Sequence, residues 1–241
     1  MTDQARSFDQ VAAMYAAVRP DYPTAAVAWL LPPEARRVLD LGAGTGKLTR
    51  QLVDAGHDVV AVEPSPQLRA ELAAYVPEAE LLEGGAEQIP LPDSDVDAVL
   101  VGQAFHWFDQ DRALPEIARV LRPGGRLGLL WNFDDDSVPW VNALADLTGT
   151  IARVSQRNPG VIAVEQFTDV VTADFPHRQR LDADSLCRLL QTHSRFLIQD
   201  AEGQAEVLRR TRDLVSTHPD LAGHESFVLP YVTRCWRGTR G

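Results

Sequence analysis

Positive charge is scarce in this chain, and one kind of basic residue is almost absent. Lys47 is the only lysine, and 23 lysines and arginines stand against 34 aspartates and glutamates, which gives a formal net charge of −11. The basic residues form no run. Proteins that bind nucleic acid usually carry a basic stripe on one face, so the sequence argues against nucleic acid as a partner.

Cysteines and long apolar runs are also few or missing. Cys187 and Cys235 lie far apart and lack the spacing of metal ligands. No segment approaches the roughly 18 consecutive apolar residues of a membrane helix. The opening residues MTDQARSFDQ lack the basic and apolar regions of a signal peptide. We therefore expect a cytoplasmic protein with no membrane partner and no metal.

What the chain does contain is an alternation of short apolar runs and helix-length segments. Strand-like runs such as VVAV, AVLV and LGLL are apolar throughout, which is typical of a parallel sheet covered on both faces. The pattern predicts an α/β fold whose strands lie at 37–41, 58–62, 79–83, 96–101 and 126–131, with further strands at 167–175 and 225–236. Helices are expected at 8–17, 23–31, 46–55, 66–75, 111–121, 139–153, 184–192 and 202–216.

These elements read as a single domain spanning residues 1–241. We expect a helical lid at 8–31, a ligand-binding core at 37–132, an insert with helices at 133–220 and a final strand at 225–236. The segment Leu121-Arg122-Pro123-Gly124-Gly125 predicts a helix stop and a turn before the fifth strand.

The stretch VLDLGAGTGKLTR at residues 38–50 is a glycine-rich turn between a strand and a helix. A P-loop is strongly disfavoured because Leu41 stands where its first glycine belongs and Leu48 replaces the metal-binding hydroxyl. A dinucleotide turn fits poorly because the third glycine, Gly46, comes one residue early. A plain turn with a solvated glutamate remains open, but three glycines at alternate positions are rarely needed for a turn alone.

A third ligand, S-adenosylmethionine, fits the pattern better. Asp40 precedes glycines at 42, 44 and 46, and Glu63 closes the next strand, VVAVE. Glycines leave room for a ligand against the backbone, and a carboxylate at the end of the second strand can accept the two ribose hydroxyls. Loops at 42–46, 63–65, 84–88 and 102–108 follow strand ends and should converge on one crevice.

Several motifs resemble those of class I S-adenosylmethionine-dependent methyltransferases. They are LDLGAGTG, VEPS, GGAEQIPLPDSDVDAV and ARVLRPGGRLGLLWN, within residues 37–132. The chain is most similar to the group that includes trans-aconitate methyltransferase and many bacterial small-molecule methyltransferases. GQAFHWFD, SFDQVAAMYAAVRPDYP and LPYVTRCW extend the resemblance over most of the chain. It implies a Rossmann-like, mostly parallel, seven-stranded sheet with helical decorations over the crevice.

The resemblance also implies roles for individual residues at the cofactor. Gly42, Ala43 and Gly44 would line the methionine part, Glu63 would bind ribose, and Gln103 would lie under the methionine part. Residues 85–87 would flank adenine. The family often has aspartate where this chain has Gly85, so either Glu87 or the backbone contacts the adenine amine, or adenine is held more loosely. The residues expected at the cofactor are Tyr15, Arg19, Asp40, Gly42, Ala43, Gly44, Gly46, Glu63, Pro64, Gly85, Ala86, Glu87 and Gln103.

The loop GQAFHWFD at 102–109 should face the methyl acceptor. Enzymes that methylate DNA bases or amide nitrogens carry [DNS]-P-P-[YF] at this place, and the sequence GQAF does not match that pattern. His106 is the one side chain of the loop that could exchange a proton near neutral pH. It either deprotonates or orients a hydroxyl acceptor, or it only lines the pocket. We expect Trp107 and Phe108 to form pocket wall and core rather than a stacking surface. The residues expected on the acceptor side are Tyr22, His106, Trp107, Trp131 and Trp140.

Two functions remain open from the sequence. The favoured one is an enzyme that methylates a small molecule, with oxygen as the acceptor atom, in a carboxylate or a hydroxyl. The other is a non-catalytic S-adenosylmethionine-binding regulatory protein. The run Asp134-Asp135-Asp136 is interpreted as a solvated acidic turn and not as a metal site.

Overall fold

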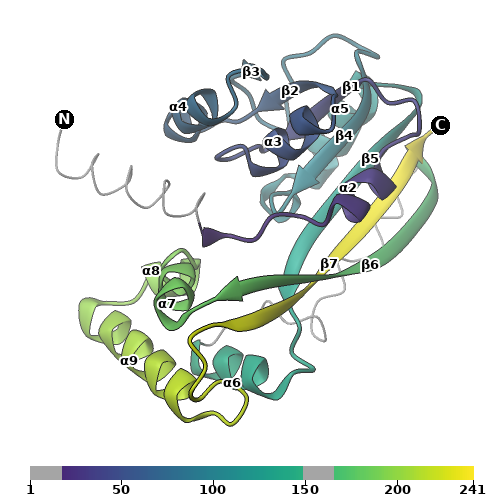
Figure 1. The fold of residues 1–241 in the computed structure, drawn as a ribbon. Coiled ribbons are helices and arrows are strands. Elements are labelled where there is room, and N and C mark those ends of the chain that lie inside the picture. Colours follow the sequence, from purple (N-terminus) through teal and green to yellow (C-terminus); the bar gives the residue numbers. More distant parts are fainter. Residues whose placement is uncertain (1–17, 149–165) are drawn as a thin grey trace. The chain divides into compact units, whose positions relative to one another are not determined.

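The computed structural model describes residues 18–148 and 166–241 of the chain (Figure 1). Tyr15 and the helix expected at 8–17 lie outside the described residues, as does the end of the helix expected at 139–153. The described helices and strands are α2 (Thr24–Leu30), β1 (Arg37–Leu41), α3 (Lys47–Asp54), β2 (Asp58–Val62), α4 (Pro66–Tyr75), β3 (Glu80–Leu82), β4 (Val96–Gly102), the 3-10 turn η1 (Phe105–Trp107), α5 (Gln110–Val120), β5 (Leu121–Asp134), α6 (Pro139–Thr148), β6 (Phe167–Leu181), α7 (Ala183–Gln191), α8 (Ser194–Leu197), α9 (Ala201–Thr217) and β7 (Phe227–Arg240).

The strands form one seven-stranded sheet in the order β3-β2-β1-β4-β5-β7-β6. β1 pairs in parallel with β2 and with β4, and β2–β3 and β4–β5 are parallel as well. The arrows of the neighbouring strands β6 and β7 run in opposite directions (Figure 1). The predicted mostly parallel, seven-stranded α/β sheet is therefore confirmed.

The central strands are buried on both faces, as their uniformly apolar sequences predict. Val38 and Leu39 of β1, and Ala98 and Val99 of β4, have no exposed surface. Because consecutive side chains of a strand point to opposite faces, each strand contributes to packing above and below the sheet. On one face Leu48 and Leu52 of α3 and Leu30 of α2 join Val38 and Ala98 in a single cluster.

The described residues group into two compact units. The core unit comprises 21–132, 166–175 and 233–241, and the second unit comprises 18–20, 133–148 and 176–232. Each has its own apolar cluster: that of the second unit includes Trp140, Leu144 and Leu186 from its helices and Phe227 and Tyr231 from β7. The turn predicted at 121–125 lies inside β5, where the register with β4 jumps from Val96–Leu121 to Ala98–Arg126. The strands β6 and β7 extend beyond their expected ends to Leu181 and Arg240.

Helix starts follow the caps that the sequence provides. The hydroxyl of Ser65 accepts a hydrogen bond from the amide of Leu68, and Pro66 occupies the first position of α4. Asp182 and Asp200 cap α7 and α9 in the same way. The carboxylate of each accepts a hydrogen bond from the amide three residues further along the chain. The α4 cap matters for function because it fixes the chain directly after Glu63.

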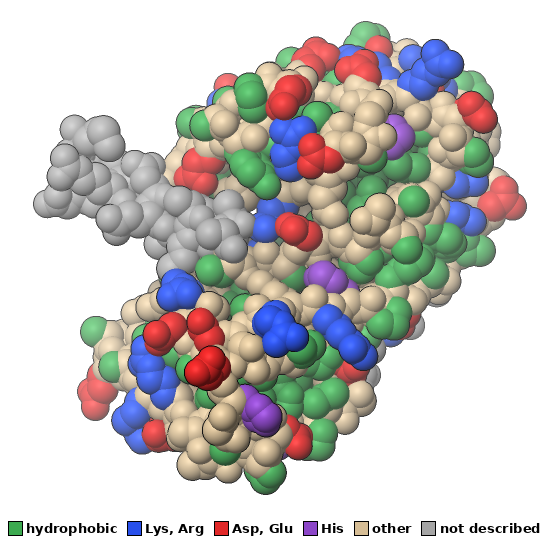
Figure 2. Space-filling model, viewed as in Figure 1, with side chains coloured by type: hydrophobic (Ala, Val, Ile, Leu, Met, Phe, Trp, Pro, Cys, Tyr) green, Lys and Arg blue, Asp and Glu red, His purple; other side chains and the backbone are tan. Residues whose placement is uncertain are grey.

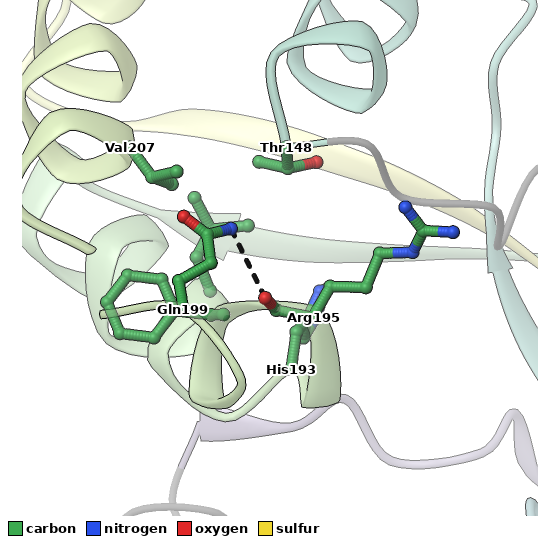
Figure 3. Close-up of a pocket in the computed structure, with 7 residues that line it drawn as sticks. Thr148, His193, Arg195, Gln199 and Val207 are labelled. Atoms are coloured by element: carbon green, nitrogen blue, oxygen red, sulfur yellow. Dashed lines mark hydrogen bonds between the residues drawn. The ribbon is translucent and has the colours of Figure 1, made fainter. Parts of the chain in front are cut away.

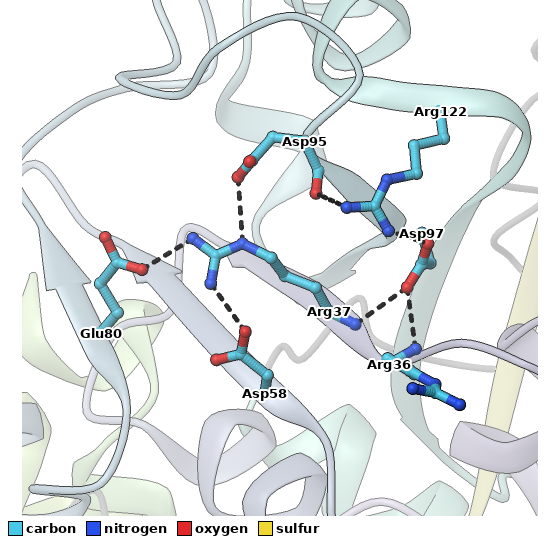
Figure 4. A network of polar contacts seen from close by, with 7 residues as sticks. All are labelled: Arg36, Arg37, Asp58, Glu80, Asp95, Asp97 and Arg122. Carbon is cyan, nitrogen blue, oxygen red and sulfur yellow. Dashed lines mark hydrogen bonds and ion pairs between the residues drawn. The ribbon is translucent and has the colours of Figure 1, made fainter.

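A network of ion pairs connects the amino-terminal ends of neighbouring strands (Figure 4). The Arg37 guanidinium contacts Asp58 at 2.8 Å, Glu80 at 2.7 Å and Asp95 at 3.1 Å. Burial alone would lower the pKa of Arg37, but the three carboxylates outweigh it and the net pKa is raised. Asp97 accepts from the amides of Arg36 and Arg37 and from the Arg122 side chain. The network lies at the strand ends opposite to the glycine turn.

Charge on the visible surface is mixed. In Figure 2, basic and acidic side chains lie interspersed on the face shown, without one continuous basic area. Within the described ranges, no helix has the length and apolar character needed to span a bilayer.

Candidate functional site

The chain order of the sheet reverses between β1 and β4. From β1 the order runs through β2 to β3 on one side, and β4 with β5 begins the other side. In open α/β sheets such a switch point leaves a crevice beyond the carboxyl ends of the two strands, where ligands bind. The loops that follow β1 and β4, at 42–46 and 103–109, are therefore expected to border a ligand site.

The glycine turn after β1 is anchored to the end of β2. The amides of Gly42 and Ala43 both donate to the carbonyl of Val62, at 2.8 and 3.2 Å, and Gly46 donates to Ala43 at 3.0 Å. Gly42, Gly44 and Gly46 have φ values of 74°, 58° and 89°. Residues other than glycine rarely adopt this left-handed region. The backbone conformation of the turn therefore explains why glycine stands at these alternate positions.

Gly42 also marks where the two loops touch. A Cβ atom at this position would lie 2.8 Å from the Cβ of Ala104 and 3.5 Å from the ring of Phe108. Gly44 differs, because a Cβ there would meet no atom within 4 Å. The turn is thus closed against the β4 loop at Gly42 and open at Gly44, which leaves backbone accessible to a ligand.

Glu63 is the carboxylate at the end of β2, and it is only 6% exposed. Its Oε2 accepts from the amide of Gly44 at 2.9 Å, and its Oε1 accepts from the amide of Ser65 at 2.9 Å. Each carboxylate oxygen has a second lone pair. The side chain is therefore held in place by backbone and still has one acceptor site per oxygen for a pair of ligand hydroxyls.

Asp40 lies beneath the turn and is 1% exposed. Its Oδ2 accepts from the hydroxyl of Thr49 at 2.7 Å. Burial raises the pKa of Asp40 to about 7; the hydrogen bonds from Thr49 oppose that rise, and the charge of Glu63 adds to it. Asp40 supports the turn from below, and the structure gives it no path to solvent.

This raised pKa makes stability pH-dependent. The folded state holds the Asp40 proton more tightly than the unfolded chain does. The stabilisation from the protonated Asp40 is therefore fully present below about pH 4 and is lost as the pH rises toward 7. Asp40→Asn keeps an acceptor for Thr49 but never ionises. We expect its free energy of unfolding, relative to that of the wild type, to rise by on the order of 2–4 kcal/mol between pH 4 and pH 8. Urea unfolding across that range measures the difference, with Asp111→Asn on the exposed face of α5 as control. An equal difference at both pH values would contradict the assignment.

The loop after β3 meets the loop after β4 through Glu87. Its Oε1 accepts from the amide of Asp109 at 2.9 Å, and its Oε2 would lie 3.2 Å from a Cβ at Gly85. Ala86 is buried, and Gly85 pairs with Gln88 in an isolated bridge. The carboxylate of Glu87 therefore lies beside Gly85. Its expected contact with an adenine amine stays a prediction.

Gln103 follows β4 in a strained conformation. It has a φ of 59°, which is unusual for a residue with a side chain. Its amide donates to Leu130 at 3.0 Å and its Nε2 donates to the carbonyl of Asn132 at 3.3 Å. Strain of this kind persists where surrounding contacts enforce it, often at functional sites.

The remaining expected residues are dispersed. Tyr22 is 8% exposed, and its hydroxyl lies over Gly102, where a Cβ would be 2.7 Å away. Its backbone amide and carbonyl are both bonded by the side chain of Gln51. Pro64 is exposed and its carbonyl accepts from Arg69 at 2.7 Å. Trp131 is 6% exposed and lies within β5.

Arg19 and Trp140 belong to the second unit. The Arg19 guanidinium donates to the hydroxyl and the carbonyl of Thr192, at 2.9 and 3.0 Å. Trp140 is 4% exposed and packs edge-on against Phe227 with ring centroids 5.5 Å apart. Their expected roles at the cofactor and the acceptor stay predictions.

The acidic run at 134–136 differs from the solvated turn expected. All three residues are half-buried. Burial raises the pKa of Asp134 to about 6, with Arg19 opposing that rise and Asp136 adding to it. Across the described ranges, no group of three or more histidine, cysteine or acidic side chains is arranged to hold a metal.

A small cavity of about 10 Å³ in the second unit is lined by Thr148, Leu190, His193, Arg195, Phe196, Gln199 and Val207. Gln199 donates from its amide nitrogen to the carbonyl of Arg195 at 3.2 Å, as Figure 3 shows. Burial, aided by Arg19, lowers the pKa of His193 to about 3, so this imidazole is neutral. Such a volume holds about one water molecule, which is too little for a substrate.

Sequence reasoning missed the residues that support the site from within. Thr49 holds Asp40, the amide of Ser65 holds Glu63, and Gln51 holds the backbone of Tyr22. Phe108, in contrast, was expected as pocket wall and core, and its ring lies next to Gly42.

Comparison with known proteins gives a consistent result. The model of a family described as a methyltransferase domain matches residues 39–129. An uncharacterised methyltransferase of Mycobacterium tuberculosis is 46% identical over 237 residues, which cover 98% of this chain and 97% of that protein. A malonyl-[acyl-carrier protein] O-methyltransferase of Methylococcus capsulatus is 42% identical over 109 residues, 43% of this chain and 39% of that protein. Among solved structures, a protein assigned as a type II methyltransferase from Anaeromyxobacter dehalogenans has a TM-score of 0.69 at 24% identity, over 92% of this chain and 96% of that one.

Proposed function

The chain belongs to the class I S-adenosylmethionine-dependent methyltransferases, and we propose that it transfers the methyl group to an oxygen atom of a small molecule. The acceptor oxygen is that of a carboxylate or a hydroxyl, in the branch of small-molecule enzymes that includes trans-aconitate methyltransferase. The enzyme acts in the cytoplasm, without nucleic acid or membrane as partner. The observation that carries this proposal is the turn at 42–46 with the anchored carboxylate of Glu63 beside it.

The residues at the switch point fit the cofactor. Glu63 offers one free acceptor site on each oxygen, which suits two adjacent ribose hydroxyls. Gly44 has open space where a side chain would stand, and Glu87 is beside Gly85 to accept from an adenine amine. S-adenosylmethionine, when bound, supplies an electrophilic methyl group on a positively charged sulfur.

The protein's part in the reaction is mainly positioning. Holding two reactants in line can contribute ~7–11 kcal/mol to lowering a barrier. Gly42 lies so close to Ala104 and Phe108 that no side chain fits between them, which places the acceptor loop against the cofactor turn. His106 stands on that loop and is exposed, so it can take the proton of a hydroxyl acceptor or orient a carboxylate.

An oxygen acceptor is favoured by two observations. The loop Gly102-Gln103-Ala104-Phe105 lacks the proline pair that holds a planar exocyclic nitrogen. One relative, 42% identical over 109 residues, is named as an O-methyltransferase. Isothermal titration with S-adenosylmethionine and its demethylated product, followed by methyl-release assays on carboxylic acids and phenols, tests the proposal. Binding of neither compound would refute it, and binding without transfer to any acceptor would favour the regulatory alternative.

The role of His106 has its own test. We expect His106→Ala to lower kcat with a phenolic acceptor by about 10²–10⁴-fold, the usual contribution of a general base, while cofactor affinity changes less than threefold. Steady-state kinetics with titration of the demethylated cofactor measure both. His224→Ala, which removes an exposed imidazole of the second unit, is the control. Unchanged turnover in His106→Ala would rule out proton transfer by this residue.

A further inference from the structure

The loop after β4 carries four consecutive ring-bearing residues, Phe105, His106, Trp107 and Phe108, folded as the 3-10 turn η1 and its cap. In a 3-10 turn, residues three apart lie on the same side. Phe105 and Phe108 are such a pair, and their rings meet edge-to-face with centroids 5.8 Å apart. With three residues per turn, His106 and Trp107 leave the turn in two other directions than the Phe105–Phe108 pair.

The two phenylalanines anchor the turn. Phe105 is only 3% exposed, and the Phe108 ring lies next to Gly42, within 3.5 Å of where a Cβ would be. The backbone adds to this anchorage, because Trp107 donates its amide to Ala104 at 2.9 Å and Asp109 donates to Glu87. These contacts anchor the loop, and the side chains of His106 and Trp107 extend from the anchored turn.

Trp107 is 76% exposed, against 6% and 4% for Trp131 and Trp140. An indole buries a large apolar area when it is packed, so one left exposed on a rigid turn is available for contact. The imidazole of His106 lies beside it, with ring centroids 4.8 Å apart and planes inclined at 42°. The exposure of Trp107 contradicts the expectation that it belongs to the core, and the arrangement places an open aromatic face beside an imidazole, which can accept a proton.

We propose that Trp107 is a stacking surface for the acceptor, and that the acceptor's reacting oxygen belongs to a planar, conjugated acid or phenol. The flat part of the acceptor lies on the indole, and its oxygen lies at His106. A new bond joins this oxygen to the methyl carbon while the carbon–sulfur bond breaks and its electrons stay on sulfur. A carboxylate needs no proton removed, whereas the proton of a phenol goes to His106. The inference rests on the proposed methyl transfer to oxygen.

The test compares acids that differ in flatness. With the demethylated cofactor present, benzoate is titrated against cyclohexanecarboxylate, and sorbate against hexanoate, by quenching of tryptophan fluorescence and by calorimetry. We expect each planar acid to bind about tenfold more tightly than its saturated partner, as stacking on an aromatic side chain typically provides. Trp107→Ala should remove this preference, and Trp107→Phe should keep most of it, with cofactor affinity unchanged in both.

The control is Tyr75→Ala, which removes another exposed aromatic ring, at the end of α4. Because Trp107 is largely exposed, its variants should fold, and thermal unfolding checks this. Equal binding of planar and saturated acids to the wild type, including no binding of either, would overturn the stacking proposal. A change of oligomeric mass in Trp107→Ala without a change in acid preference would also overturn it, in favour of a protein contact. Failure to bind the demethylated cofactor would instead refute the proposed function.

Discussion

Gly42→Ala is expected to lower methyl transfer at least 100-fold and to destabilise the protein. The residue has a φ of 74°, where an alanine costs about 1–2 kcal/mol. Its Cβ would lie 2.8 Å from the Cβ of Ala104, a backbone-attached atom that cannot rotate away. The β4 loop must then move, and with it Phe108 and the acceptor side. We expect at least a 100-fold loss of kcat/KM, because small misplacements at a reacting centre have effects of that size.

Two other glycines separate backbone strain from crowding. Gly44 has a φ of 58°, and a Cβ added there in Gly44→Ala would have no atom within 4 Å. It should cost a similar strain yet weaken cofactor binding strongly, because the methyl group enters the space assigned to the cofactor. Gly124→Ala has a φ of 77° and equally open surroundings in the turn within β5. It should cost stability alone.

Urea unfolding and calorimetric titration of the demethylated cofactor together distinguish the three variants. Gly42→Ala loses the most stability and also binding, Gly44→Ala loses binding together with about as much stability as Gly124→Ala, and Gly124→Ala loses stability alone. If Gly44→Ala bound the cofactor like the wild type, the turn at 42–46 would not be the cofactor site.

Glu63→Gln should weaken cofactor binding by about 30–150-fold, which corresponds to about 2–3 kcal/mol for hydrogen bonds to a charged group. The carboxylate accepts from two amides, those of Gly44 and Ser65. A glutamine has one acceptor oxygen, so its NH₂ group must face one of these amides, donor against donor. The variant therefore loses the anionic acceptor for ribose and also loosens the turn.

Glu83→Gln is the matched control for this variant. Glu83 pairs with Arg69 at 2.7 Å, but its side chain is 76% exposed, and such surface pairs contribute little. Calorimetry should show an unchanged cofactor affinity. Equal affinity in Glu63→Gln and Glu83→Gln would exclude Glu63 from ribose binding.

The sequence was sufficient for the sheet and for the turn because both depend on local pattern. Runs such as Val59–Val62 are apolar at every position, and in the sheet Val60, Ala61 and Val62 have no exposed surface. Glycines at alternate positions needed left-handed backbone, and the three φ values agree with that. The carboxylate at Glu63 followed from its place at the end of a strand.

The rest of the site depends on contacts between distant residues, which no spacing in one sequence reveals. Tyr22 meets Gly102 and Gln51 only because the strands bring them together. Trp107 was expected to form pocket wall and core, but it is 76% exposed, because Phe105 and Phe108 take the inward positions of the turn. The half-buried setting of Asp134 likewise arises from the packing of the second unit, and the run of three carboxylates gave no sign of it.

The Arg37 network has a consequence for how the molecule moves. It ties β1, β2, β3 and the start of β4 together through one guanidinium at the edge away from the glycine turn. Amide protons in the middle of β1 and β4 should therefore exchange with solvent last. Amide protons in the turns at the carboxyl ends of the strands should exchange earlier, because these turns open by local fluctuation. Ligand entry and exit can then proceed through small openings at one edge while the clamped edge keeps the strands in register.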